Sequence, residues 1–201
     1  MTNSAPYIHA LKWLDERNIG LNWHEVALIG KYTRIRNVKA KEILMAQDQL
    51  VTRFYFLNSG IVRLSRIEEG TDHTLGLIDS RDFLSSPQFV LNKEISTCTL
   101  ETLTDAELLE WNYDGILAIK KRIPNLYNAE LALMSRLLNW VQQNQIEMKC
   151  LSAEKRYQLL LERQPNVLLT IPLKYIASYL GIHTDSLSRI RKNHLTPAKR
   201  Q

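Results

Sequence analysis

The sequence IPLKYIASYLGIHTDSLSRIRK, residues 171–192, contains two helical patterns separated by Gly181. On both sides of this glycine apolar residues recur at helical spacing, which predicts one buried face on each helix. The small Ala177 allows the second helix to cross closely over the first, and Gly181 can adopt the positive φ of a tight turn. Ile182 is expected to fill the gap between the helices, and Thr184 to cap the second helix. These features together predict a helix-turn-helix. Its expected inward-facing residues are Ile176, Ala177 and Leu180, then Leu187 and Ile190.

The other face of the second predicted helix is polar and basic. Hydroxyl, carboxylate and guanidinium groups suit base edges, and the basic groups among them also suit phosphates. The residues on this face are Thr184, Asp185, Ser188, Arg189 and Lys192.

Basic residues are distributed unevenly along the chain. The 201 residues include 26 Lys plus Arg and 21 Asp plus Glu, a net charge of +5. Residues 149–201 hold ten of the bases and three of the acids, a net charge of +7, which leaves −2 for residues 1–148. A slightly acidic body joined to a basic end is typical of a protein with a nucleic-acid-binding segment.

Residues 33–111 have the composition of antiparallel strands. Short runs rich in Ile, Val, Phe, Tyr and Thr alternate with turn residues at intervals of roughly 8 to 12 residues, which favours a closed or sandwiched β-structure over β-α-β units. The clearest pair, 53–57 and 61–65, flanks Asn58-Ser59-Gly60 and is predicted to form a hairpin. Two short helices are expected before this region, within residues 5–31, with Asn22 capping the second.

Residues 125–148 predict one long helix, because they follow Pro124 and contain neither Gly nor Pro. Apolar residues occupy more than one of its faces. One interpretation is a core helix packed only on the β-structure. We favour a second copy of the chain on the other face, because a wide apolar surface needs two partners to cover it, with Asn144 as a polar register position. The predicted seam is Tyr127, Glu130, Met134, Leu137, Val141, Asn144 and Met148, with Leu126, Leu133 and Trp140 beside it.

Composition excludes several classes of protein. Apolar residues make up 45% of the chain, which is enough for a hydrophobic core and argues against disorder. Cys98 and Cys150 are too few for a disulfide scaffold or a Cys-x-x-Cys site. No apolar run approaches the ~20 residues of a membrane span, and the first residues lack the layout of a secretory signal. We therefore expect a cytoplasmic protein with no membrane partner.

Catalytic motifs are also missing from the sequence. A cupin-type enzyme shares a small β-barrel, but it needs clustered histidines and a carboxylate for its metal, whereas the five histidines here are scattered. There is no G-x-S-x-G nucleophile elbow. We expect no enzyme activity, no metal site and no cofactor. A third interpretation is a ligand-binding or dimerisation module with a vestigial helix-turn-helix.

Three segments carry a family resemblance. PLKYIASYLGI and TDSLSRIRK are very similar to the helix-turn-helix of Crp/Fnr transcription regulators of the Bacteroidetes-type branch, and FYFLNSGIVRL resembles the family's barrel hairpin. The order of elements agrees over essentially the whole chain. The resemblance implies a homodimer through the 125–148 helix, a ligand-sensing β-roll and paired recognition helices in adjacent major grooves of double-stranded DNA. It also implies RNA polymerase as a partner.

The resemblance assigns roles to individual residues. Arg189 falls where the family commonly places an arginine that reads guanine, and its neighbours would share the base readout. Lys174, Arg191 and Lys192 are better candidates for phosphates. His183 lies at the turn, where its position fits a plain surface residue as well as a DNA contact. The candidate DNA-contact residues are Lys174, His183, Thr184, Asp185, Ser186, Ser188, Arg189, Arg191 and Lys192.

One region departs from the family. Members that bind cyclic nucleotides carry a Gly-Glu pair for the ribose and, about a dozen residues later, an arginine for the buried phosphate. Here Ser85-Ser86 stands at the Gly-Glu position, Pro87 removes a backbone N–H, and Ser96-Thr97 occupies the Arg-Ser position. We therefore expect no cyclic AMP or cyclic GMP binding of the usual kind, and the effector is unknown. The alternative is a regulator that still responds to a cyclic nucleotide or another small effector through the β-roll.

The expected architecture is α+β. Residues 1–124 would form a jelly-roll-like antiparallel β-roll sensor domain with flanking helices, 125–148 the dimerisation helix, and 149–201 the all-α helix-turn-helix domain. Ser152 is expected to start a new helix that ends near Pro165. The wing common in the family is expected to be reduced or absent, because residues 193–198 are too few and too polar for a hairpin.

Overall fold

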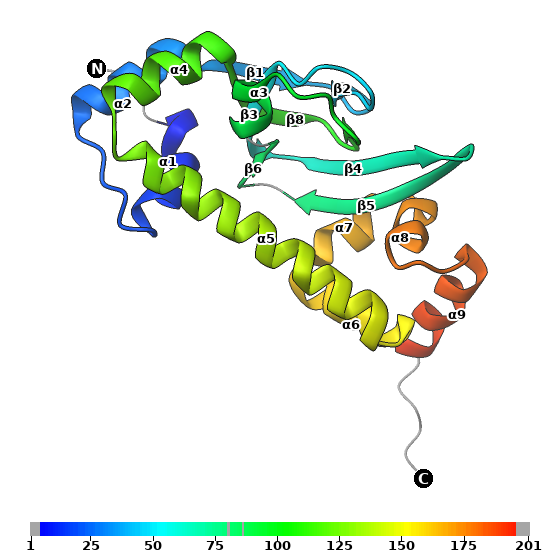
Figure 1. The fold of residues 1–201 in the computed structure, drawn as a ribbon. Coiled ribbons are helices and arrows are strands. Elements are labelled where there is room, and N and C mark those ends of the chain that lie inside the picture. The colour runs from blue at the N-terminus through cyan, green and yellow to red at the C-terminus, as the bar shows by residue number, and fades with distance from the viewer. Residues whose placement is uncertain (1–4, 80, 86, 196–201) are drawn as a thin grey trace.

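The computed structural model describes residues 5–79, 81–85 and 87–195 and builds its β-structure from two four-stranded antiparallel sheets (Figure 1). The apolar core of the β-roll lies between them and includes Leu57, Val62, Leu100 and Leu108, all buried. The expected antiparallel β-roll is confirmed. In spatial order, the first sheet contains β1 (Arg34–Val38), β8 (Ala106–Asn112), β3 (Arg53–Ser59) and β6 (Asp82–Leu84), and the second contains β2 (Ile43–Met45), β7 (Thr99–Thr102), β4 (Ile61–Glu68) and β5 (Thr71–Asp79).

The hairpin predicted around Asn58-Ser59-Gly60 is wrong. Strand β3 pairs with β6 and β8, whereas β4 pairs with β5 and β7, so the chain changes sheets at Gly60. Gly60 has φ +107°, and a Cβ there would lie 2.6 Å from Cβ of Ala106, so only glycine passes this close to β8. The hairpin is instead β4–β5, where Glu69 and Gly70 both have positive φ, as a type I′ turn requires.

Helices gather at the end of the β-roll where the long helix begins (Figure 1). Asn22 caps the second of them as predicted: its side chain accepts from the backbone N–H of Glu25 at 3.0 Å, and the Glu25 carboxylate accepts from the backbone N–H of Asn22 at 2.8 Å. These elements are η1 (Ala5–Tyr7), α1 (Ile8–Asp15), α2 (Trp23–Tyr32) and α4 (Tyr113–Arg122), while α3 (Pro87–Asn92) lies between β6 and β7 in sequence.

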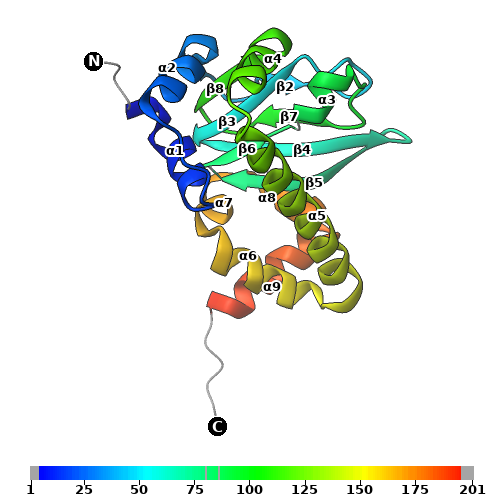
Figure 2. The same cartoon turned by 60° about the vertical axis from the view of Figure 1, so that its left-hand side comes forward.

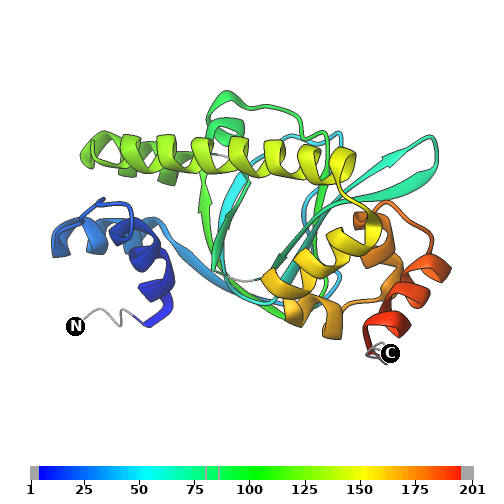
Figure 3. The same cartoon turned by 90° about the horizontal axis from the view of Figure 1, so that it is seen from below.

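Helix α5 (Leu126–Cys150) confirms the predicted long helix and runs from the N-terminal helices to the C-terminal ones (Figure 3). Its inner face packs on both ends of the β-roll, with Leu126 and Leu133 against the N-terminal core and Trp140 against Gly76 of β5. The predicted seam is partly wrong, because Glu130 forms an ion pair with Lys120 and Asn144 lines a cavity facing β5.

Most of the exposed apolar side chains of α5 follow a different seam, although Leu137 and Ile146 are also exposed and lie outside it. It consists of Tyr127, Leu131, Met134, Leu138, Val141, Gln145 and Met148, at alternating steps of four and three. Met134 is partly buried and the others are exposed. This alternation is the heptad spacing of helices that pair with another helix.

Four helices make up the C-terminal part of the chain (Figure 2): α6 (Ala153–Arg163), α7 (Pro165–Thr170), α8 (Leu173–Tyr179) and α9 (Thr184–Leu195). Ser152 caps α6 as predicted, since its Oγ accepts from the backbone N–H of Lys155 at 3.2 Å. No strand occurs between residues 113 and 195, and residues 196–198 of the expected wing region lie outside the described part of the chain. None of the described helices is long and apolar enough to cross a bilayer.

Candidate nucleic-acid interface

The turn between α8 and α9 closes the first helix with a Schellman motif. The backbone N–H of Ile182 donates to the carbonyl of Ala177 at 3.0 Å, and that of Gly181 donates to the carbonyl of Ser178 at 3.1 Å. Gly181 has φ +63°, which confirms its predicted conformation. A Cβ at Gly181 would also lie 2.8 Å from Cε of Met148 on α5, the end of a flexible side chain that would have to shift, so the positive φ is the main reason for glycine here.

The predicted helix-turn-helix core is confirmed. Ile176, Ala177, Leu180 and Leu187 are almost completely buried, in one cluster with residues of α6 and α7. Ile182 and Ile190 are partly buried and pack against the same cluster. The inward face of α9 is therefore fixed, which also fixes the face that it turns outward.

The outward face of α9 carries the polar residues expected there. Thr184, Asp185, Ser188, Arg189 and Lys192 are all exposed. Ser188 Oγ donates to the carbonyl of Thr184 at 3.0 Å, so this hydroxyl has a partner inside the helix.

The remaining candidate residues lie at the edges of this face. His183 is exposed in the turn, and Ser186 and Arg191 are partly buried. Lys174 is exposed on α8, with its Nζ 4.8 Å from the ring centroid of Tyr175. The prediction that Thr184 caps α9 is wrong by one residue: the helix begins at Thr184, and the carbonyl of His183 accepts its first backbone hydrogen bond from Leu187 at 3.1 Å.

Two of the bases in the basic C-terminal region have partners within the chain. Arg156 donates to the carbonyls of Leu151 and Leu180, at 2.6 and 2.7 Å, and so ties α6 to the helix-turn-helix. Arg163 forms an ion pair at 2.7 Å with Glu147, a buried carboxylate of α5. The net charge of this region therefore overstates the positive charge that it presents to a partner. A count of charges along the sequence cannot tell the bases that pair within the chain from those that are available to a partner.

The helix-turn-helix is docked on the second sheet through α8, which lies beside β5 (Figure 1). The backbone N–H of Thr74 on β5 donates to Ser178 Oγ on α8 at 2.9 Å. Arg63 of β4, only 3% exposed, places its guanidinium carbon 4.2 Å from the ring centroid of Tyr175. The sequence gives no sign of this contact, because Arg63 lies on a strand with alternating polar residues.

Carboxylates and a hydroxyl fix the position of the Arg63 guanidinium. It donates to Thr74 Oγ1 at 2.9 Å, pairs with Glu101 at 2.8 Å and forms a further ion pair with Asp72. Because these contacts fix the guanidinium in place, it offers an aromatic ring a fixed position for a cation–π contact. Arg63 thus connects three strand residues of the β-roll to the first helix of the helix-turn-helix.

A cavity of about 400 Å³ with both apolar and polar lining residues lies at the same junction, between β5, α5, α6 and α8. Its lining includes Asn144 and the Glu147–Arg163 pair. Tyr179 also lines it, and burial raises the pKa of the Tyr179 hydroxyl, which therefore stays protonated.

In the stretch that corresponds to the family's cyclic-nucleotide site, the hydroxyls of Ser85 and Ser96 are in different states. Ser85 has φ +70°, a conformation that favours glycine, and its buried Oγ has no hydrogen-bond partner among the described residues. Ser96 is buried, and its Oγ donates to the carbonyl of Cys98 at 2.6 Å, while Thr97 is exposed. Ser86, the other half of the predicted departure, lies outside the described residues, and Pro87 is the first residue of α3.

Comparisons with known proteins agree with this architecture. Residues 35–122 match the cyclic nucleotide-binding domain family. No curated protein matches the chain in sequence. The fold is similar to FixK2 from Bradyrhizobium japonicum, with a TM-score of 0.70 and 14% identity over 81% of this chain and 85% of that one.

Two other solved structures share the fold. A protein from Eubacterium rectale, described as a transcriptional regulator of the Crp/Fnr family, has a TM-score of 0.69 and 21% identity over 87% of this chain and 84% of that one. The catabolite activator protein of Thermus thermophilus has a TM-score of 0.55 and 23% identity over 88% and 84%. The Bacteroidetes-type branch stays a prediction. Residues 35–122 thus match the model of the cyclic nucleotide-binding domain family, and the chain has the fold of the Crp/Fnr regulators.

Proposed function

We propose that the protein is a homodimeric, sequence-specific DNA-binding transcription regulator without enzyme activity. The observation that carries this proposal is the outward face of α9, where short polar groups and bases are held on a helix whose opposite face is buried. Arg189 would read guanine with Thr184, Asp185 and Ser188 beside it, and Lys174, Arg191 and Lys192 would contact phosphates. In this role the protein acts in the cytoplasm and contacts RNA polymerase.

The heptad seam of α5 supports the homodimer. Leu131 and Leu138 are 67% and 69% exposed, which is costly for leucine on a helix unless a partner covers it. A second copy supplies the matching seam, because a two-fold axis brings the same face of both helices together. The polar seam position is then Gln145 rather than the predicted Asn144.

Replacing Leu138 by Glu tests the dimer. Two carboxylates facing each other across an apolar seam must lose their hydration, so L138E should shift the protein to the monomer. Gln142→Glu is the matched control, because Gln142 is exposed on the same helix outside the seam. Sedimentation equilibrium at micromolar concentration should give a dimer for the unmodified chain and Q142E and a monomer for L138E. A monomeric unmodified chain, or a dimeric L138E, would contradict the seam.

The proposal includes a sensor domain that does not take a cyclic nucleotide in the usual way. Two features support this. Serine replaces the pair that holds the ribose, and Ser96 uses its hydroxyl within its own loop. Neither Ser96 nor Thr97 supplies the positive charge that a buried cyclic phosphate needs.

Selection of bound sequences from a random duplex pool, with and without cyclic AMP, tests the function directly. We expect a near-palindrome whose half-sites are centred about one helical turn apart, roughly 10 base pairs, with the same motif and affinity in both arms. Affinity should fall as salt rises, because phosphate contacts release counterions. If no sequence is enriched, the proposed regulator function is wrong. If sequences are enriched only with cyclic AMP, the regulator function stands, but the proposal that the sensor domain does not take a cyclic nucleotide in the usual way is wrong.

A further inference from the structure

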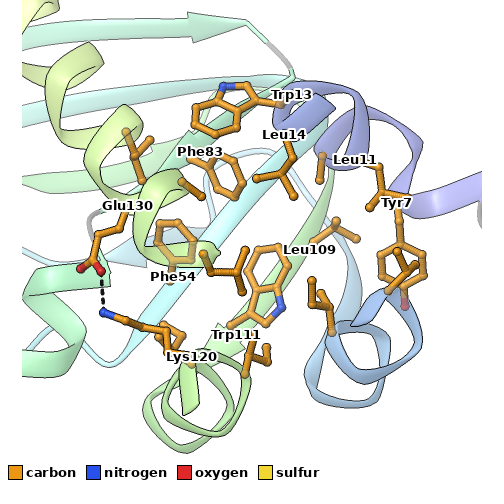
Figure 4. A pocket seen from close by; sticks show the side chains of 18 residues that line it. Tyr7, Leu11, Trp13, Leu14, Phe54, Phe83, Leu109, Trp111, Lys120 and Glu130 are labelled. Atoms are coloured by element: carbon orange, nitrogen blue, oxygen red, sulfur yellow. Dashed lines mark hydrogen bonds and ion pairs between the residues drawn. The ribbon is translucent and has the colours of Figure 1, made fainter. Parts of the chain in front are cut away.

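An apolar pocket of about 130 Å³ lies between the N-terminal helices, the first sheet and the start of α5 (Figure 4). Aromatic rings form much of its wall. Phe83 meets Trp13 edge to face at a centroid distance of 4.9 Å and stacks on Phe54 at 5.3 Å, and Trp111 lies beyond Phe54 at 5.7 Å. We refer to it as the ring pocket. It is separate from the junction cavity, which lies at the other end of α5.

Water is a poor occupant of the ring pocket. A buried water needs two to four polar partners, whereas this lining is almost entirely apolar. An apolar cavity of about 150 Å³ lined by aliphatic and aromatic side chains stays dry and takes up benzene, so the volume here suits about one aromatic ring. The ring walls would add edge and stacking contacts to such a guest.

The charged residues of the ring pocket neutralise each other. Lys120 and Glu130 line one side and form an ion pair, drawn as a dashed line in Figure 4. Both side chains are only 16% exposed. An ionised ligand would find no unpaired opposite charge in the pocket, so its loss of hydration would not be compensated. The electrostatics therefore favour a neutral ligand.

Two polar groups of the lining are unsatisfied. Trp13 and Trp111 are each 6% exposed, and each indole Nε1–H is buried without an acceptor among the described residues. An unpaired buried donor destabilises the fold, because it gives up its hydrogen bond to water and gains none in return. Unpaired groups of this kind are uncommon in a native core, so the packing around the two indoles is not optimised for stability alone.

We propose that the ring pocket is a binding site for a neutral, single-ring aromatic molecule. Such a ligand would touch Phe83 of the β-roll and, across the pocket, Ala129 and Leu133 of α5. These two residues lie on the inner face of α5, whose outer face carries the heptad seam. Binding would join the β-roll to α5, and it does not depend on DNA binding.

Benzene is the probe, and the indole N–H signals of the full chain in a two-dimensional NMR spectrum are the readout. The chain has four tryptophans. Titration should shift the signals of Trp13 and Trp111 to saturation and leave those of Trp23 and Trp140, which lie outside the ring pocket, unchanged. Shifts of all four signals, or of none up to the solubility of benzene, would overturn the proposal.

Cavity-filling variants test the location. Ala129→Leu puts a larger side chain into the ring pocket and should abolish the shifts, whereas Ala132→Leu, on the same helix and outside the lining, should keep them. Ala10→Val, from α1, is a second filling variant should A129L unfold. Retained benzene shifts in a folded filling variant would contradict the proposed site. Duplex binding measured on the same samples separates this result from the proposed function.

Discussion

Helices α8 and α9 are neighbours in sequence and share one buried core, yet their outer faces meet different surroundings. Helix α8 places Tyr175 on the Arg63 guanidinium and Ser178 on the backbone of β5. Helix α9 leaves Arg189 and the residues around it exposed. The first helix therefore docks on the second sheet of the β-roll, and the second helix is the one available to a partner. The division predicts that substitutions on the two helices have separable effects.

The largest effect is expected from Arg189→Ala. Loss of a bidentate contact to guanine should remove about 1–3 kcal/mol of base discrimination, roughly a 5- to 150-fold fall in the ratio of specific to random duplex affinity. Arg191→Ala is the control, because a lost phosphate contact weakens both duplexes alike. Competition titrations at fixed salt measure the ratio. If R189A loses the same affinity for both duplexes, Arg189 does not take part in base readout.

A smaller effect is expected from Tyr175→Leu. Without the ring, the Arg63 guanidinium loses a cation–π contact that is worth up to about 2 kcal/mol when desolvated. Amide hydrogen exchange in α8 should therefore become faster while exchange in α9 changes less. Tyr175→Phe keeps the ring and should exchange like the unmodified chain. Unchanged exchange in Y175L would show that the ring does not hold α8 on the sheet.

The smallest effect is expected from Ser178→Ala, which removes the acceptor for the backbone N–H of Thr74. One neutral hydrogen bond contributes about 1 kcal/mol, so the midpoint of urea unfolding should fall slightly and the amide of Thr74 should exchange faster. The ratio of specific to random duplex affinity should not change. A change in that ratio would mean that α8 also takes part in base readout.

Local patterns explain which features could be predicted from the sequence. Apolar spacing and a glycine at the turn were sufficient for α8, Gly181 and α9, because each depends on residues close in the chain. The exposed face of α9 followed from its buried one. The same holds for the caps at Asn22 and Ser152, where a short polar side chain precedes a helical pattern.

Features that depend on distant residues could not be predicted in this way. Gly60 resembles a hairpin turn, but its contact with Ala106 on β8 decides that the chain changes sheets. The docking of Arg63 on Tyr175 joins residues more than a hundred positions apart. In α5 the spacing allowed two seams, and only the folded partners of Glu130 and Asn144 showed which side faces inward.

Met148 contributes to two parts of the structure. It is the last position of the α5 seam, and its methyl group fills the space that Gly181 leaves open in the helix-turn-helix. In the proposed dimer, a partner helix that packs against Met148 would also bear on the contact between this methyl group and the turn. Met148 would then link the dimer contact of α5 to the turn that precedes α9.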